Sequence, residues 1–204
     1  MSRISSEPTE LIRDAQQGDS EAFGRLLDRY GHYLLLLARV QVGRRLQGKV
    51  DPADLVQETF LEAHRHFPTF RGQSEPEVAA WLRQILAGVL ANTLRRYLGT
   101  QGRDIRLERE LAGELGQSSV SLDRGLADPG PTPSKLAAGR ERAVLLADAL
   151  AELPTDYQEV IVLRHLEERP FAEVARRMGR TEDAVQKLWV RALARLRKAL
   201  DSED

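Results

Sequence analysis

The chain contains no cysteine, and this absence excludes several classes of protein. Disulfide-stapled folds, thiolate metal sites and cysteine nucleophiles all need the thiol, and nothing in the sequence requires an oxidising compartment. Only four histidines are present. His64 and His66 lie two residues apart on a predicted helix and face different ways, while His32 and His165 are isolated, so we expect no metal site and no cofactor.

Long apolar stretches are also missing. The first ten residues are polar and lack the apolar core of a signal peptide. The longest apolar run, from Tyr33 to Ala38, is far too short to cross a bilayer. We therefore expect a cytoplasmic protein with no membrane partner.

Aromatic residues make up only 5% of the chain, whereas charged residues make up 30% and Leu, Ala and Arg are prominent. This balance suits amphipathic helices better than sheets, so we predict an all-α protein. The length of 204 residues allows one large domain or two small ones. The stretch 113–139 is dense in Gly, Ser, Pro and Asp, which predicts a flexible linker between helical domains at 1–112 and 140–204.

Residues that favour the start of a helix mark helices in both domains. Asp51 followed by Pro52 predicts a helix that runs to about His66, and a second helix begins at Ser74 or Glu75 and carries the strongest helical periodicity in the chain. In the second domain, Thr155–Gln158 has the form of a capping box.

The stretch from Pro170 to Arg197 has the proportions of a helix-turn-helix. Gly179 supplies the turn residue that tolerates a positive φ, and Thr181 can cap the last helix. Between Thr181 and Leu200 five basic residues stand against two acidic ones, although the whole chain has a net charge of −1. This local excess predicts a DNA-facing surface, and its competing interpretation is a solvated basic face on a structural bundle.

Three stretches resemble the signatures of the extracytoplasmic-function (ECF) RNA polymerase sigma factors: DPADLVQETFLEAHRHF (51–67), FRGQSEPEVAAWLRQIL (70–86) and the segment 149–200. The resemblance implies that the first domain is sigma region 2, which binds the β′ clamp helices of core RNA polymerase and opens the minus-10 promoter element. It also implies that the second domain is region 4, which binds the β flap and recognises minus-35 DNA.

The polymerase-binding pattern of the family falls on one predicted helix, at Asp51, Asp54, Leu55, Gln57, Glu58 and Phe60. Carboxylate and amide groups at helical spacing suit a basic partner helix. The alternative is an acidic solvent-facing surface with Leu55 and Phe60 in the core.

Strand opening requires a surface that traps an unstacked base. In the family the loop before the long helix forms it, and the matched minus-10 residues are Phe70, Arg71, Gly72, Gln73, Ser74, Gln84, Gly88 and Asn92. Phe70 could stack on a base, although packing is the favoured role. The chain departs from the family pattern, since it is two residues longer between Ser74 and Trp81, and Gln84 and Gly88 replace the usual Arg and Asn.

The residues matched to minus-35 recognition are Arg164, Thr181, Gln186, Lys187, Val190, Arg191 and Arg195. Gln, Lys and Arg near the start of a recognition helix can contact base edges, and Arg195 is better placed for phosphates. Only Arg164 and Arg191 have the residue type usual in the family.

Three other functions compete with this interpretation. A helix-turn-helix regulator that does not join polymerase leaves the Asp51–Phe60 pattern without a role, and a protein-binding adaptor leaves the basic helix unexplained. An enzyme is least supported, because no catalytic cluster or phosphate-binding loop occurs, and no small-molecule substrate is expected. The expected partners are core polymerase and promoter DNA, with an anti-sigma factor as a further candidate.

Overall fold

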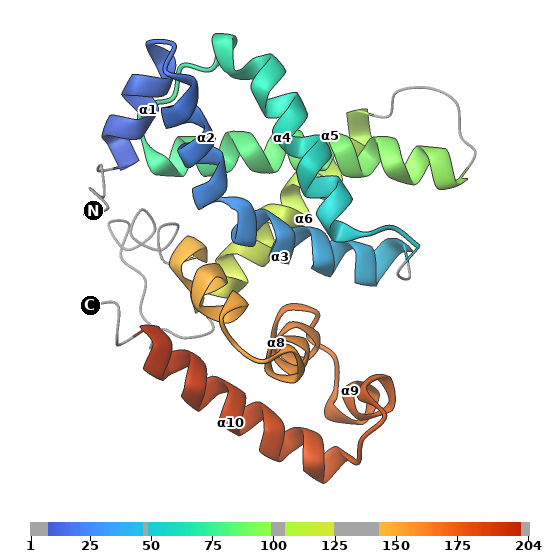
Figure 1. The fold of residues 1–204 in the computed structure, drawn as a ribbon. Helices are drawn as coiled ribbons and strands as arrows, with labels where there is room; N and C mark the ends of the chain where they lie inside the picture. Colours follow the sequence, from blue (N-terminus) through green and yellow to red (C-terminus); the bar gives the residue numbers. More distant parts are fainter. Residues whose placement is uncertain (1–7, 47–48, 99–104, 125–142, 201–204) are drawn as a thin grey trace.

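The structure, a computed structural model, describes residues 8–46, 49–98, 105–124 and 143–200. Every regular element within these ranges is a helix, which confirms the predicted all-α fold. Figure 1 shows two groups of helices, and α10 lies on the side of the second group that faces away from the first.

The first group, or first module, contains two short irregular helices among six α-helices. Its elements are α1 (Pro8–Gln16), α2 (Ser20–Arg29), α3 (Gly31–Gln41), the π-helix η1 (Val42–Leu46), α4 (Pro52–His66), the 3-10 helix η2 (Phe67–Thr69), α5 (Glu75–Leu98) and α6 (Ile105–Arg124).

Helix α4 begins and ends where the sequence predicts. The side chain of Asp51 accepts a 2.8 Å hydrogen bond from the N–H of Ala53, and Pro52 occupies the first turn, where its missing N–H costs nothing. Helix α5 follows at Glu75 and buries Leu82, Leu86 and Leu90 in the core of the module.

Helix α6 corrects the predicted domain boundary, because it continues to Arg124 through the first half of the predicted linker. Leu111 and Leu115 are fully buried, and the hydroxyl of Tyr33 donates a 3.0 Å hydrogen bond to Ser119. This burial outweighs the helix-weakening effect of the glycines, whose abundance suggested a linker. The first module thus reaches Arg124, and the remaining predicted linker lies outside the described residues.

The second group, or second module, begins with helical residues 143–151. It continues with α8 (Thr155–Ile161), the π-helix η3 (Val162–Leu166), α9 (Phe171–Met178) and α10 (Glu182–Leu200).

The capping box predicted at Thr155–Gln158 is wrong. Helix α8 has Pro154 at its N-cap position, with no side-chain cap bond. The Gln158 amide instead donates to the carbonyls of Ala151 and Leu153, at 3.0 and 2.9 Å, and so satisfies acceptors near the end of the preceding helix.

The turn between α9 and α10 has the predicted helix-turn-helix form. Gly179 has a φ of 62° in the left-handed region, and the N–H of Arg180 bonds the carbonyl of Ala175 at 2.9 Å. Thr181 accepts a 3.3 Å bond from the N–H of Ala184, as its predicted capping role requires. Within the described ranges, no helix combines the length and apolar content needed to cross a membrane.

Candidate functional site

The exposed face of α4 carries the polar part of the predicted polymerase-binding pattern. Asp51, Asp54 and Gln57 are exposed, and Glu58 is half-buried. Asp54, Gln57 and Glu58 help to line a groove of about 430 Å³, which Arg96 of α5 also borders. Arg96 lies 3.7 Å from Glu58. An ion pair at the surface is weak, so Glu58 can form an ion pair with a partner protein in place of Arg96.

The two apolar residues of the pattern, Leu55 and Phe60, differ in their exposure in the structure. Leu55 is only 2% exposed and packs in the core, so it is not part of the candidate docking surface. Phe60 is half-buried. Leu61, to which no sequence pattern pointed, is 63% exposed and lines the same groove as Asp54 and Gln57. Its spacing of seven residues from Asp54 and four residues from Gln57 could have indicated that it shares their helix face.

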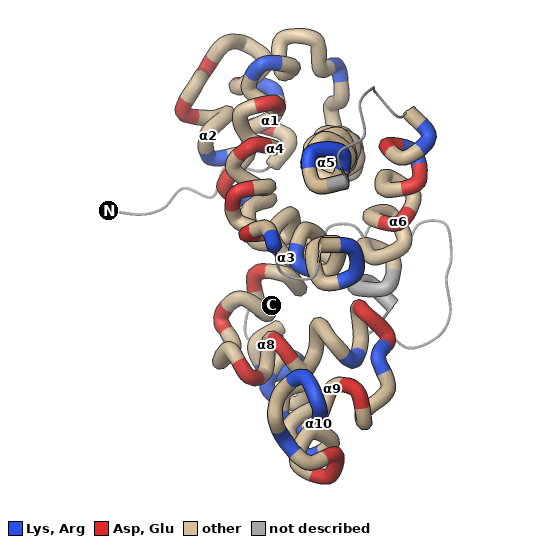
Figure 2. The backbone as a smooth tube through the Cα atoms, turned by 90° about the vertical axis from the view of Figure 1, so that its right-hand side faces the viewer, with Lys and Arg blue, Asp and Glu red and all other residues tan. Residues whose placement is uncertain are grey.

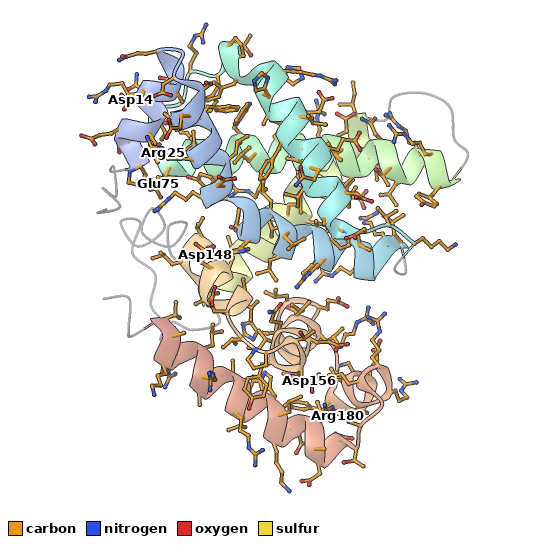
Figure 3. All side chains as sticks on the ribbon, in the orientation of Figure 1. Asp14, Arg25, Glu75, Asp148, Asp156 and Arg180 are labelled. Carbon is orange, nitrogen blue, oxygen red and sulfur yellow. The ribbon has the colours of Figure 1, made fainter. Side chains whose placement is uncertain are left out.

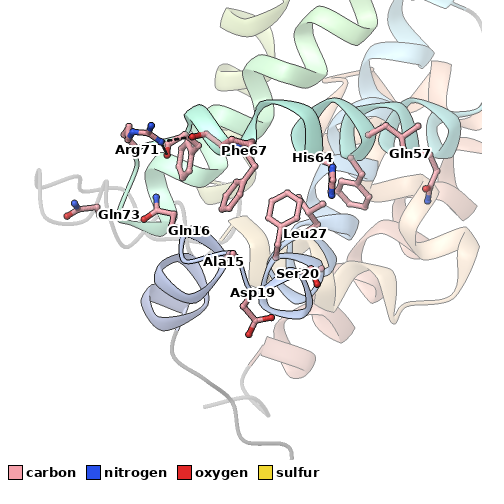
Figure 4. Close-up of a pocket in the computed structure, with 17 residues that line it drawn as sticks. Ala15, Gln16, Asp19, Ser20, Leu27, Gln57, His64, Phe67, Arg71 and Gln73 are labelled. Atoms are coloured by element: carbon pink, nitrogen blue, oxygen red, sulfur yellow. Dashed lines mark hydrogen bonds between the residues drawn. The ribbon is translucent and has the colours of Figure 1, made fainter.

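A larger hollow of about 710 Å³ lies between α1–α2 and the α4–η2 segment (Figure 4). Its wall includes Phe23 and Phe67, whose ring centroids are 4.2 Å apart. Leu61 also lines it, as do Arg71 and Gln73 of the predicted minus-10 loop. The hollow therefore combines aromatic surface with cationic and amide groups.

The loop that forms one rim of this hollow is held by specific contacts. Phe70 is 8% exposed, and its ring centroid lies 4.7 Å from that of Trp81, so it packs, as favoured from the sequence. The amide of Gln16 donates a 2.8 Å bond to the carbonyl of Gly72. A Cβ on Gly72 would lie 2.3 Å from the Phe70 ring, which explains the glycine. Arg71 donates a 2.7 Å bond to the carbonyl of Pro68 and remains exposed.

Glu77 of α5, which was not among the residues predicted from the sequence, orders the end of this loop. Its carboxylate accepts bonds from the Ser74 hydroxyl at 2.7 Å and from the N–H of Gln73 at 2.9 Å. These bonds stabilise the charged form and hold the pKa of Glu77 below its ordinary value.

The other predicted minus-10 residues follow one stripe of α5. Gln84, Gly88 and Asn92 are four residues apart, so they share a helix face. Gln84 is exposed and the other two are half-buried. Asn92 already accepts a hydrogen bond from Arg95, which leaves Gln84 the most accessible member of the stripe.

The outer face of α10 presents the predicted minus-35 residues together. Basic residues recur along this helix in Figure 2. Gln186, Lys187, Arg191 and Arg195 are all exposed, and among them Val190 is 59% exposed. Lys187 lies 2.7 Å from Asp183 one turn earlier, in a solvent-exposed pair.

The inner face of α10 anchors it to its module. Val185, Ala192 and Leu196 are buried, and the ring of Trp189 packs edge-on against Phe171 with 5.6 Å between centroids. The opposite face is thus the one left for a ligand.

Arg164 differs from the other predicted minus-35 residues. It is half-buried, its Cζ lies 4.8 Å above the Phe171 ring, and it donates a 3.4 Å bond to the carbonyl of Arg169. The structure does not bring it into the exposed row on α10.

Comparisons with known proteins agree with this division into modules. The family model "Sigma-70 region 2" matches residues 29–98, and "Sigma-70, region 4" matches residues 143–196. The ECF RNA polymerase sigma factor BldN of Streptomyces coelicolor is 33% identical over 98% of this chain and 68% of its own length. The ECF RNA polymerase sigma-E factor of Haemophilus influenzae is 33% identical over 81% of this chain and 80% of its own.

A solved structure, that of the RsbN–BldN complex, is also similar. It shares 28% sequence identity, covers 92% of this chain and 97% of the matched chain, and has a TM-score of 0.31.

Regions 2 and 4, in this order on two helical modules, define a transcription initiation factor of the sigma-70 class. With the relatives matched over most of its length, the chain belongs to the ECF RNA polymerase sigma factor family. Sigma factors are initiation factors and not catalysts, in keeping with the interpretation as a non-enzyme.

Proposed function

We propose that this sigma factor docks on the β′ clamp helices through α4, captures opened minus-10 DNA at the loop 70–74, and recognises minus-35 DNA with α10. The single observation that carries the proposal is the division of charge. The exposed acidic groups of α4 and the exposed basic row of α10 lie on different modules. One protein partner and one nucleic-acid partner would account for this division.

The docking surface combines an apolar anchor with surrounding charge. The exposed side chain of Leu61 lines the same groove as the carboxylates of Asp54 and Glu58 and the side-chain amide of Gln57. An exposed apolar side chain surrounded by polar groups suits a partner that buries the apolar side chain and forms hydrogen bonds or ion pairs with the polar groups around it. A basic helix, such as the β′ clamp helices, fits these requirements.

The aromatic hollow beside the loop is our proposed site for an unstacked base. Single-strand capture relies on aromatic faces for stacking and cationic groups for phosphates. Phe67 and Arg71 supply these two elements, and Gln73 offers an amide to a base edge. Gln84 on α5 is the further minus-10 contact that the observed exposure favours.

On α10, Gln186, Lys187 and Arg191 are our proposed base-contacting residues, and Arg195 contacts phosphate. Val190, an exposed aliphatic side chain between these polar residues, suits a thymine methyl group. We assign Arg164 a positioning role through its contact with the Phe171 ring, in place of a direct base contact.

The relative BldN has been solved bound to another protein, RsbN. We propose that this chain also binds a second protein, an inhibitor of the anti-sigma type. Such an inhibitor would act in the cytoplasm, where polymerase and chromosome are.

A gel-shift titration with and without core polymerase tests the proposal. We expect weak binding of promoter DNA by the free chain and tight, sequence-specific binding once core is present, because core holds both modules on one DNA. Equal and tight specific binding without core would contradict the proposal. That result would favour the alternative, a helix-turn-helix regulator that does not join polymerase.

A further inference from the structure

An acidic side chain, that of Asp183, lies within the basic row on the outer face of α10. Lys187 and Val190 follow it by four and seven residues, so the three side chains share one face of the helix. The side chain of Asp183 is 75% exposed, and its carboxylate accepts a 2.7 Å hydrogen bond from the Lys187 ammonium group. On a surface that faces DNA, a carboxylate is repelled by the phosphates, so it lowers affinity unless it makes a specific contact.

We propose that Asp183 and Lys187 together recognise one cytosine–guanine pair in the minus-35 element, with Asp183 contacting the cytosine and Lys187 the guanine. The inference rests on the proposed function, in which α10 contacts the major groove of that element. It adds a base contact at Asp183 and assigns a base pair to the two side chains.

The structural requirements at the start of α10 are met without Asp183. Thr181 accepts a hydrogen bond from the N–H of Ala184 and so caps the helix. Glu182 already supplies a carboxylate to the positive end of the helix dipole. The exposed ion pair between Asp183 and Lys187 adds little stability. Helix stability alone therefore does not account for the carboxylate at position 183.

The start of α10 is fixed to the rest of its module, and this orients the Asp183–Lys187 pair. In the turn before α10, Arg180 forms an ion pair with Asp156 near the start of α8 (Figure 3). Val185, two residues after Asp183, is fully buried. Asp183 is the second residue of α10, and the first turns of a recognition helix are the part that contacts base edges.

The two side chains present an acceptor beside a donor, and a cytosine–guanine pair presents the complementary pattern. In the major groove, the N4 donor of cytosine lies beside the O6 acceptor of guanine. The Asp183 carboxylate can only accept, so it suits N4, whereas the Lys187 ammonium group can only donate, so it suits O6 and the neighbouring N7 of guanine. The 2.7 Å separation of the two groups allows both to contact one base pair.

Other base pairs fit less well. An adenine–thymine pair also places a donor, adenine N6, beside an acceptor, thymine O4. However, the N7 acceptor of adenine would repel the carboxylate, and the thymine methyl group would crowd the ammonium group. With either pair reversed, the carboxylate would face an acceptor oxygen. The repulsive contacts thus restrict the site to one base pair in one orientation.

Selection from random DNA tests the proposal with the full chain in holoenzyme. Duplexes of promoter length with a randomised upstream region are bound by wild-type, Asp183→Ala and Glu182→Ala holoenzymes, and the bound DNA is sequenced. We expect wild type to enrich a minus-35 sequence that contains a cytosine–guanine pair. Asp183→Ala should lose the preference at that pair, by about fivefold or more. It should bind other sequences at least as tightly as wild type does, because a charge that repels phosphate has been removed.

Glu182→Ala is the matched control. Glu182 is also exposed and acidic, but it lies one residue earlier, about 100° around the helix from Asp183. The two variants remove the same charge from the start of α10. Glu182→Ala should therefore enrich the same sequence as wild type.

Modified bases test the contacts in the unaltered protein. N4-methylcytosine still pairs with guanine, but its methyl group replaces the N4 hydrogen that faces the major groove. At the selected pair it should weaken binding by wild-type holoenzyme about fivefold or more, and leave binding by Asp183→Ala unchanged. On the other strand, 7-deazaguanine, which lacks N7, should weaken binding by wild type but not by Lys187→Ala.

Three results would overturn the proposal and leave the proposed function intact. They are an unchanged sequence preference in Asp183→Ala, a uniform loss of affinity for all sequences in that variant, and a loss of preference in Glu182→Ala equal to that in Asp183→Ala. Unchanged wild-type binding to N4-methylcytosine DNA would also overturn it. If wild-type holoenzyme enriched no upstream sequence, the proposed function itself would be contradicted, and with it the role of Asp183.

Discussion

Glu77 and Ser74 are joined by two hydrogen bonds, since the Glu77 carboxylate accepts from the Ser74 N–H at 3.1 Å and from its hydroxyl at 2.7 Å. The pair fixes the loop that precedes α5 at the rim of the aromatic hollow. Glu77→Gln should therefore loosen the loop and reduce promoter opening severalfold without unfolding the chain. Permanganate reactivity of unpaired thymines in the holoenzyme complex measures this, with Glu159→Gln as control.

The effect of Glu77 should also depend on pH in a defined direction. Its pKa is lowered by the Ser74 and Gln73 bonds, so the stabilisation is complete above the ordinary value of 4.5 and is lost as pH falls through the lowered pKa. The protection factor of the Gln73 amide, which is its exchange rate corrected for the intrinsic pH dependence of exchange, should thus be constant from neutral pH to about pH 5 in the free chain. Loss of protection already between pH 7 and 6 would contradict this assignment.

The docking surface on α4 makes a separate prediction. Asp54→Ala and Leu61→Ala should each weaken the binding of core polymerase. For Leu61→Ala, which removes the apolar anchor, the loss of binding free energy should be roughly 1–2 kcal/mol or more. Both side chains are exposed, so the free energy of unfolding should change by no more than about 0.5 kcal/mol. Titration of labelled chain with core checks the first expectation, and thermal denaturation checks the second.

Asp28→Ala, an exposed acidic change on α2, is the control for these variants. Wild-type affinity of both the Asp54 and the Leu61 variants would exclude α4 as the docking surface.

Recognition by α10 can be tested at the level of single DNA groups. Arg191→Ala should weaken minus-35 discrimination by roughly 1–3 kcal/mol, the usual value of a bidentate base contact. If Val190 contacts a thymine methyl, replacing that thymine with deoxyuridine should weaken wild-type binding but not binding by Val190→Ala. A scan of deoxyuridine positions by holoenzyme binding would reveal this, and an identical profile for both proteins would remove Val190 from the recognition surface.

Helix α6 predicts a stability effect outside the functional surfaces. Leu115 is fully buried, so Leu115→Ala should lower the free energy of unfolding by about 2–5 kcal/mol through lost burial and a cavity. Val120, on the same helix, is 38% exposed, and Val120→Ala should cost much less. Equal and small effects in urea denaturation would contradict the extension of the first module to Arg124.

Sequence patterns predicted the helices best where a local cap and a long apolar stripe agreed. Asp51 and Pro52 fixed the start of α4 because both act within the first turn. The part of α6 that lies inside the predicted linker was missed because Gly113 and Gly116 weaken helices locally. The burial of Leu111 and Leu115 depends on packing of α6 against α5 and α3, which the local sequence does not show.

The two four-residue capping patterns show why local motifs are insufficient alone. Thr155–Gln158 fits the pattern, but Pro154 takes the cap position and Gln158 bonds the preceding helix. Ser74–Glu77 also fits, and there Glu77 does reach back to the Ser74 N–H. Tertiary packing decided between them, and the sequence does not show that packing.

For the candidate sites, helix periodicity separated most exposed residues from buried ones on α10 but not on α4. Val185 and Ala192 are buried, whereas Gln186 and Arg191, which the sequence selected for base contacts, are exposed. On α4, Leu55 is buried in the core, whereas Leu61 is exposed. The sequence did not predict this difference, because the family pattern ends at Phe60 and does not state which of its residues are exposed.

The most direct test of the central claim is transcription in vitro with core polymerase on fragmented genomic DNA, followed by mapping of start sites. We predict that wild-type chain directs initiation at a defined set of promoters with shared minus-10 and minus-35 elements, and that Asp54→Ala reduces initiation at all of them. Initiation no different from core polymerase alone, under conditions where a known sigma factor is active, would contradict the claim.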